Sequence, residues 1–136
     1  MPTVVHVGPI SSPGGIQTVI GTLSSNPPDG WTLETIESHS SGSYLSKLQA
    51  YNNAKKRLEE LANQNNDGLI VHLHAASDYS FLRKLRLAEH AHRHGGKIVF
   101  HIHSGNIVSW LGRKDRAKKL KQRLENCKAT IVCLSK

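Results

Sequence analysis

Residues 97–105 read KIVFHIHSG, a stretch that is typical of a strand in an α/β protein. It opens as a short run of apolar and β-branched side chains, which is typical of a buried strand, and it closes on a Ser-Gly pair, which is typical of a loop. The glycine pair Gly95-Gly96 stands before it and ends a helical pattern. A helix, a strand and a loop in immediate succession indicate one unit of an alternating α/β chain.

The same alternation covers the rest of the sequence. Strands are predicted over residues 3–7, 31–36, 69–73, 97–102 and 129–134, and helices over 16–25, 44–63, 78–94 and 113–126. Strands that alternate with helices favour a parallel sheet with helices on both faces and right-handed crossovers. We therefore expect one open, doubly wound, Rossmann-like α/β domain over 1–136.

Apolar residues recur at helical spacing in the predicted helices, so they are expected to face the core. The inward positions of the last three helices are Leu45, Leu48, Tyr51, Ala54, Leu58 and Leu61, then Phe81, Leu82, Leu85, Ala88 and Ala91, then Ala117, Leu120 and Leu124.

Length and composition are those of a single globular domain. The chain has 136 residues, of which 38% are hydrophobic and 21% charged. It has no apolar run near the ~20 residues of a membrane span, and its first residues lack the pattern of a signal peptide. We expect a cytoplasmic protein. Cys127 and Cys133 form no metal-binding spacing, so both are expected as reduced, buried thiols.

Positive charge is concentrated near the end of the chain. The net charge is +8, and much of it comes from Arg113, Lys114, Arg116, Lys118, Lys119, Lys121, Arg123 and Lys128. The predicted helix 113–126 is either a solvated face or a surface for an anionic partner, such as lipid, a phosphorylated acceptor or nucleic acid. Nucleic acid is disfavoured because aromatic residues are not interleaved with the charges. Peripheral contact with the inner face of a membrane through charge remains open.

A glycine loop follows the first predicted strand. Gly14 and Gly15 let the backbone approach a ligand closely, and the helix that begins at Ile16 offers free N–H groups and the positive end of its dipole. This combination suits a phosphate. The loop matches neither the dinucleotide fingerprint nor a P-loop, so a plain turn is the alternative.

Histidines stand in pairs at the ends of two predicted strands. His72 and His74 are two residues apart, as are His101 and His103, so each pair shares one face of its strand. Ligands of open α/β sheets bind beyond the carboxyl ends of the strands. His103 is the best placed to act there as a base or to hold a developing charge, and core histidines are the alternative reading of the others.

Other chemistries find less support. Four imidazoles on neighbouring strands could bind zinc, but no acidic or thiolate ligand stands beside them, so we expect no metal. His90 and His94 share a helix face and are expected in solvent near its C-terminus. Asp78 is expected to cap that helix. The sequence shows no carboxylate pair of the glycosidase kind.

Four motifs in order resemble a known family. Residues 13–19 read PGGIQTV, 67–74 DGLIVHLH, 97–105 KIVFHIHSG and 129–136 ATIVCLSK. This order resembles the N-terminal domain of retaining glycosyltransferases of family 4, which have the GT-B fold, over nearly the whole chain.

The resemblance implies roles for individual residues. His103 matches a catalytic strand-end histidine near the transferred sugar, and Gly14, Gly15 and Ile16 match a loop close to the donor diphosphate and the acceptor. His74 matches the rim facing the acceptor, and Ser104 and Gly105 follow the catalytic strand. The donor would be a nucleotide sugar, without a metal or other cofactor, and the acceptor a glycan or lipid-linked glycan of the cell-envelope kind. Basic surfaces, here including Arg113, Lys114, Arg116, Lys118, Lys119 and Lys121, dock several members on membranes.

Within residues 1–136 we expect no counterpart of the second domain that binds the nucleotide sugar in this family. A hexosyltransferase activity would therefore need a C-terminal domain or a partner subunit. The alternatives are a non-catalytic module that binds an acceptor or an anionic membrane, and a flavodoxin-like domain that binds a nucleotide by itself.

Overall fold

The computed structural model describes residues 2–10, 14–38, 43–65, 68–76, 79–103, 107–112 and 115–133, except for the side chains of Tyr79 and Val108. The strands are β1 (Thr3–Gly8), β2 (Thr32–Glu37), β3 (Leu69–Ala75), β4 (Lys97–Ile102) and β5 (Thr130–Cys133). The helices are α1 (Gly15–Ser24), α2 (Tyr44–Gln64), α3 (Tyr79–Arg93), α4 (Ile107–Leu111) and α5 (Arg116–Asn126).

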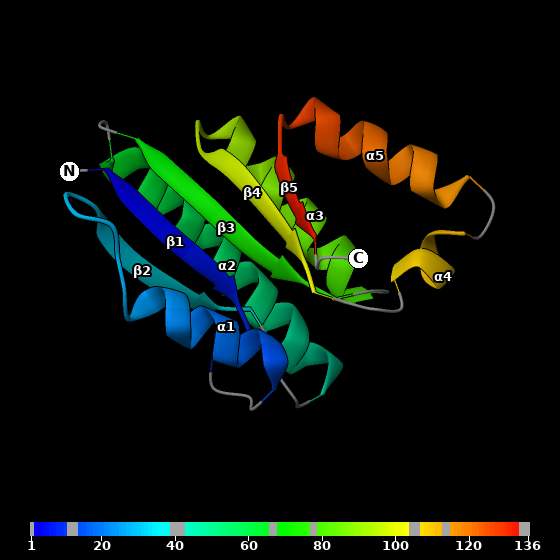
Figure 1. The fold of residues 1–136 in the computed structure, drawn as a ribbon, viewed down its shortest axis with the longest axis horizontal. Coiled ribbons are helices and arrows are strands. Elements are labelled where there is room, and N and C mark those ends of the chain that lie inside the picture. Colours follow the sequence, from blue (N-terminus) through cyan, green and yellow to red (C-terminus); the bar gives the residue numbers. More distant parts are fainter. Residues whose placement is uncertain are drawn as a thin grey trace.

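The five strands form one sheet in the order β2-β1-β3-β4-β5, and every neighbouring pair is parallel (Figure 1). The chain moves outward from β1 to β2, returns to β3 on the other side of β1, and continues to β4 and β5. The predicted Rossmann-like, doubly wound α/β class is therefore confirmed. The register sets His6 of β1 beside His72 of β3, and His74 of β3 beside His101 of β4.

Each face of the sheet has its own cover. One face carries the main core, where fully buried Val7, Leu73 and Phe100 meet apolar residues of α2, α3 and α5. The other face carries the strand histidines and receives α1, since Ile20 of α1 lies against Gly8. Figure 1 shows α2 and α3 behind the sheet, while α1 lies in front near β1 and β2.

Helix ends follow the expected chemistry. The oxygen of Ser43 accepts a hydrogen bond from the backbone N–H of Ser46 and caps the start of α2. Gly95, with a φ of 94°, follows the end of α3 in a conformation that favours glycine. The predicted stop at the Gly95-Gly96 pair is therefore confirmed, whereas the predicted cap Asp78 lies outside the described residues.

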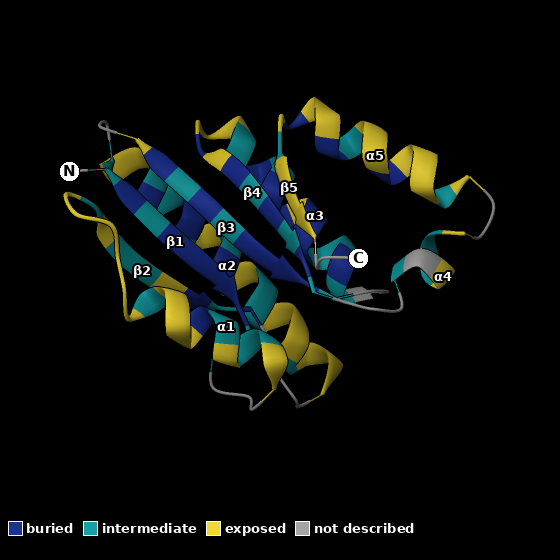
Figure 2. Ribbon diagram, viewed as in Figure 1, coloured by how far each residue is buried: buried dark blue, intermediate teal, exposed yellow. Residues whose placement is uncertain are grey.

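Some predicted inward positions are wrong (Figure 2). Leu45 and Leu48 are exposed in the first turns of α2, although Ala54, Leu58 and Leu61 are buried as predicted. A helix of 21 residues is about 31 Å long, whereas a strand of six residues spans about 20 Å, so α2 overhangs the sheet.

Further corrections concern the end of the chain. Ala117 is exposed, while Leu120 and Leu124 are buried as predicted. Cys127 is buried but Cys133 is exposed on the edge strand β5. Helix α4 was not predicted from the sequence. None of the helices within the described residues is both long and apolar enough to span a bilayer.

Candidate functional site

The carboxyl ends of β1, β3 and β4 meet at the edge of the sheet where α1 begins. Gly8 ends β1 there, and it brings α1 close to β3. A Cβ atom at this position would lie 2.7 Å from Cδ1 of Ile20 and 3.3 Å from Cβ of His74. Only glycine therefore allows this close packing of helix, strand and histidine.

The glycine loop leads into α1 as the sequence predicts. Gly14 is the N-cap residue of α1, with a φ of 154° and no side-chain cap, and its carbonyl accepts hydrogen bonds from the backbone and hydroxyl of Thr18. Gly14 and Gly15 are exposed and Ile16 is half-buried. Before the loop, the backbone N–H of Ile10 donates to Oε2 of Glu37 over 2.6 Å. This contact ties the loop to the end of β2.

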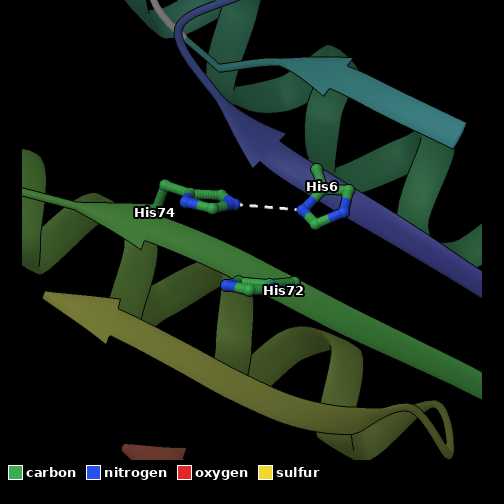
Figure 3. Close-up of side chains that lie close together, drawn as sticks. All are labelled: His6, His72 and His74. Atoms are coloured by element: carbon green, nitrogen blue, oxygen red, sulfur yellow. Dashed lines mark hydrogen bonds between the residues drawn. The ribbon is translucent and has the colours of Figure 1, made fainter. Parts of the chain in front are cut away.

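Histidines from three adjacent strands form one cluster, which we call the histidine face. It consists of His6 from β1, His72 and His74 from β3, and His101 with the adjoining His103 from β4. Figure 3 shows His6, His72 and His74 gathered on one side of β1 and β3. The rings of His72 and His74 stack with centroids 4.2 Å apart, and those of His101 and His103 with centroids 3.9 Å apart.

Three of these histidines form a continuous chain of hydrogen bonds. Nδ1 of His6 lies 3.0 Å from Nε2 of His74 (Figure 3), and Nδ1 of His74 lies 2.9 Å from Nε2 of His103. The backbone N–H of His103 also donates to the carbonyl of Ala75, over 2.8 Å. His103 is thus fixed through both its backbone and its ring.

Burial keeps the histidine face neutral. Desolvation, reinforced by the neighbouring imidazoles, lowers the pKa of His74 to about 2 and that of His72 to about 3. Desolvation, followed by the charge of His101, lowers the pKa of His103 to about 4. The pKa values of His6 and His101 are also lowered, mainly by burial.

Neutral rings give the chain two alternative polarities, because each neutral imidazole has one N–H donor and one acceptor nitrogen. If the protons run from His6 toward His103, the ring of His103 presents an N–H at Nδ1. If they run the other way, Nδ1 presents a lone pair. The chain can therefore offer a ligand either a donor or a base at the carboxyl end of β4.

Two overlapping triads of the histidine face have the ligand spacing of a metal site. One ring nitrogen from each of His6, His72 and His74 lies within 4.8 Å of the other two, and the same holds for His74, His101 and His103. Both triads need His74, however, and both its ring nitrogens are already hydrogen-bonded. The arrangement as it stands favours a hydrogen-bonded network.

The remaining predicted site residues are distributed as follows. His103 is half-buried at the carboxyl end of β4. His74 is 0% exposed, contrary to the rim position that the resemblance implies. The neighbouring histidine rings bury it. Its Nδ1 is hydrogen-bonded to Nε2 of His103, so it fixes the ring of His103. Ser104, Gly105, Arg113 and Lys114 lie outside the described residues.

The predicted basic surface divides in two. Arg116 lies over the ring of Trp110 and donates to its carbonyl oxygen, and Arg123 forms a two-point ion pair with Glu89 of α3. These two arginines hold α5 in place. Lys118, Lys119 and Lys121 are exposed along α5, and they remain accessible to an anionic partner.

Two polar residues of this region were missed in the sequence. His6 lies alone in β1, so only the register against β3 reveals its partner. Lys84 is 2% exposed in α3, and burial, followed by the charge of Arg83, lowers its pKa to about 8 against the opposing effect of Glu37. The burial of Lys84 could have been inferred from its spacing, because it lies three residues after Phe81 and four before Ala88, which are both inward positions of α3.

Comparison of the chain with models of protein families, with curated proteins and with solved structures found no match. The class of the protein is therefore defined by its sheet and its site. It is a Rossmann-like α/β domain with a glycine loop and a histidine network at the carboxyl edge of the sheet.

Proposed function

We propose that this chain is the acceptor-side half of a retaining glycosyltransferase, which moves a sugar from a nucleotide-sugar donor to a glycan or a lipid-linked acceptor. The observation that carries the proposal is the fixed position of His103, at the edge of the sheet where the glycine loop opens α1. The order of the four sequence motifs also supports it.

The geometry supports the following roles in the proposed reaction. The N-terminus of α1 supplies N–H groups and a positive dipole end toward phosphate oxygens. A completing domain, on the same polypeptide or on a partner, supplies the other groups that hold the nucleotide. His103 orients the transferred sugar or stabilises charge that develops on it, because its ring is held in advance by His74.

An apolar patch near the same edge suits a lipid-linked acceptor. Tyr44, Leu45 and Leu48 are 78%, 74% and 44% exposed at the start of α2. Helix α2 follows the carboxyl end of β2 after a short connection, so this patch and the glycine loop belong to the same end of the sheet. Exposed apolar side chains in such a group mark contact surfaces.

The proposal is tested by the rate of sugar transfer in the complete two-domain assembly. We expect His103→Ala to lower the rate from a labelled nucleotide sugar at least tenfold, which is about 1.4 kcal/mol of transition-state stabilisation. His92→Ala on α3 is the matched control and leaves the rate unchanged. An unaltered rate in His103→Ala removes this residue from the site, and tight nucleotide binding by this chain alone supports the flavodoxin-like alternative instead.

A second candidate function is docking on an anionic membrane without catalysis. The exposed side chains of Lys118, Lys119 and Lys121 favour it, since they lie along a helix whose apolar residues are engaged in the core. Docking through these lysines would also suit the glycosyltransferase, because a lipid-linked acceptor is itself found at a membrane.

A further inference from the structure

A second cluster of metal-ligating side chains lies away from the histidine face, where α2 packs against α3. His90 and His94 stand one helical turn apart on α3 and share a face, with ring centroids 4.7 Å apart. Oε1 of Glu59 on α2 lies 2.8 Å from Nε2 of His90 and 3.6 Å from Nε2 of His94. One carboxylate oxygen thus faces two imidazole nitrogens.

His90 is buried, although the sequence predicted a solvent position for it. It is 5% exposed, and its Nε2 has no hydrogen bond among the described residues, because the short contact with Glu59 is not aligned as one. A buried polar nitrogen without a directed partner is rare and needs an explanation. A metal ion bound on the lone pair of Nε2 would explain this nitrogen. The carboxylate oxygen of Glu59 lies to the side of the lone pair, where it would be a second ligand of the same ion.

The geometry points to a site for a divalent transition-metal ion, of the zinc class, held by Glu59, His90 and His94. Zinc binds imidazole nitrogen and carboxylate oxygen at about 2.0–2.2 Å, so neighbouring ligand atoms of a tetrahedral site lie about 3.3 Å apart. The two nitrogen–oxygen distances of 2.8 and 3.6 Å bracket this value. Water completes the coordination.

Access and protonation state agree with this assignment. His94 and Glu59 have side chains that are 37% and 40% exposed, so an ion can enter from solvent. Burial lowers the pKa of His90, while Glu59 opposes this effect. Its imidazole is therefore in the neutral form that coordinates metals.

The comparison with the histidine face strengthens the choice. In that cluster the ring nitrogens of His74 are both engaged in hydrogen bonds, whereas Nε2 of His90 has none among the described residues. A metal at Glu59, His90 and His94 also joins α2 to α3. Binding to the folded state alone raises the Tm with metal concentration.

The test is a titration of the protein with zinc by calorimetry, repeated with cobalt by visible absorption. Each arm carries Cys133→Ser, because Cys133 is exposed and thiols bind zinc. We expect zinc to bind at this site and to raise the Tm. His94→Ala and Glu59→Gln each weaken zinc binding at least tenfold, abolish the Tm rise and diminish the cobalt absorption. Both side chains are partly exposed, so these variants are expected to fold.

Two further variants locate the ion. His92→Ala, on the same helix but outside the cluster, leaves zinc binding unchanged. His101→Ala reports on the histidine face and also leaves it unchanged. The proposal is overturned if the protein does not bind zinc, or if His94→Ala and Glu59→Gln bind it as tightly as the parent. Loss of binding in His101→Ala alone would assign the ion to the histidine face.

Discussion

His74 links the two ends of the histidine chain, and it is the most deeply buried ring of the histidine face. It lies between His6 and His103, and each of its ring nitrogens is within 3.0 Å of a neighbouring ring nitrogen. A charge on any of these rings is disfavoured, because the rings are removed from water and lie beside other imidazoles. Burial therefore favours the network in which its histidines are uncharged.

The stability of the fold should therefore depend on pH in a defined window. The pKa values of His103, His72 and His74, at about 4, 3 and 2, all lie below the ordinary value of 6.5. Below pH 6.5 these histidines take up protons in the unfolded chain but not in the folded state. The stability that the neutral histidines contribute is therefore complete above pH 6.5 and is lost as the pH falls toward their folded-state pKa values. Each histidine lowers the unfolding free energy by about 1.4 kcal/mol per pH unit in this window.

Urea unfolding between pH 7.5 and 5.0 measures this effect while most carboxylates stay ionised. The variant His72→Gln removes one titrating ring from the half-buried part of the face, so its slope between pH 6 and 5 should be smaller by about 1.4 kcal/mol per pH unit. Equal slopes in the parent and the variant would contradict the assignment of His72 as a neutral buried group.

Gly8 is the other residue on which the site geometry depends. We expect Gly8→Ala to destabilise the fold by roughly 1–3 kcal/mol, because the added methyl group meets Ile20 and the Cβ atom of His74 in a packed interior. Gly21→Ala is the matched control: it lies exposed within α1 and its Cβ would meet nothing within 4 Å. The control should stabilise the protein by roughly 0.5–1 kcal/mol. Both are measured by urea unfolding, and an unchanged stability in Gly8→Ala would contradict the close approach of α1.

At the scale of elements, α5 combines attachment to the core with an exposed row of cations. Leu120 and Leu124 are buried, and Arg123 pairs with Glu89, so the helix is held firmly on α3. Lys118, Lys119 and Lys121 are exposed on the same helix, although Nζ of Lys121 lies 4.0 Å from Oε1 of Glu125.

Replacing Lys118, Lys119 and Lys121 by Gln should weaken binding to phosphatidylserine vesicles about a hundredfold, since each lysine near an anionic membrane contributes about 1 kcal/mol. Co-sedimentation at low and high salt measures this, and binding should fade as salt increases. Replacing Lys47, Lys56 and Lys97 by Gln removes the same charge from other exposed positions. If both triple variants lose the same binding affinity, only the net charge matters. If the variant at Lys118, Lys119 and Lys121 still binds like the parent, α5 is not the docking surface.

The elements also show how far the sequence could be read. Short apolar runs predicted β1, β3, β4 and β5, and alternation of apolar and polar residues predicted β2. Gly95 predicted the end of α3, and all these signals are local. The exposure of Leu45 was not predictable, since periodicity does not reveal where a long helix overhangs its sheet. The burial of His90 depends on Glu59, which is far away in the chain and is brought close only by the packing of α2 on α3.

The candidate site was also predictable only in its local features. The sequence placed His103 and the glycine loop at the carboxyl edge, because strand ends and loop glycines are local features. It did not reveal the chain through His6 and His74, which requires the strand order β1-β3-β4 and the register of the strands. Pairing between strands distant in sequence is therefore the information that only the fold supplies.

At the scale of the whole molecule, the sheet presents two unlike faces. One face is packed by α2, α3 and α5, and the other carries the histidine face, with α1 over β1 and β2. In the proposed function a second domain meets the carboxyl edge, where the glycine loop and His103 lie. The active species of the proposed function is therefore larger than this chain alone.

The most direct test of this claim is the mass of the species present in source cells, measured under denaturing and native conditions. We expect either a polypeptide more than twice the 15.0 kDa of this chain, or a chain of that mass in a larger native complex whose partner binds a nucleotide sugar. A monomer of 15.0 kDa under both conditions would contradict a two-domain glycosyltransferase and would favour a non-catalytic binding module.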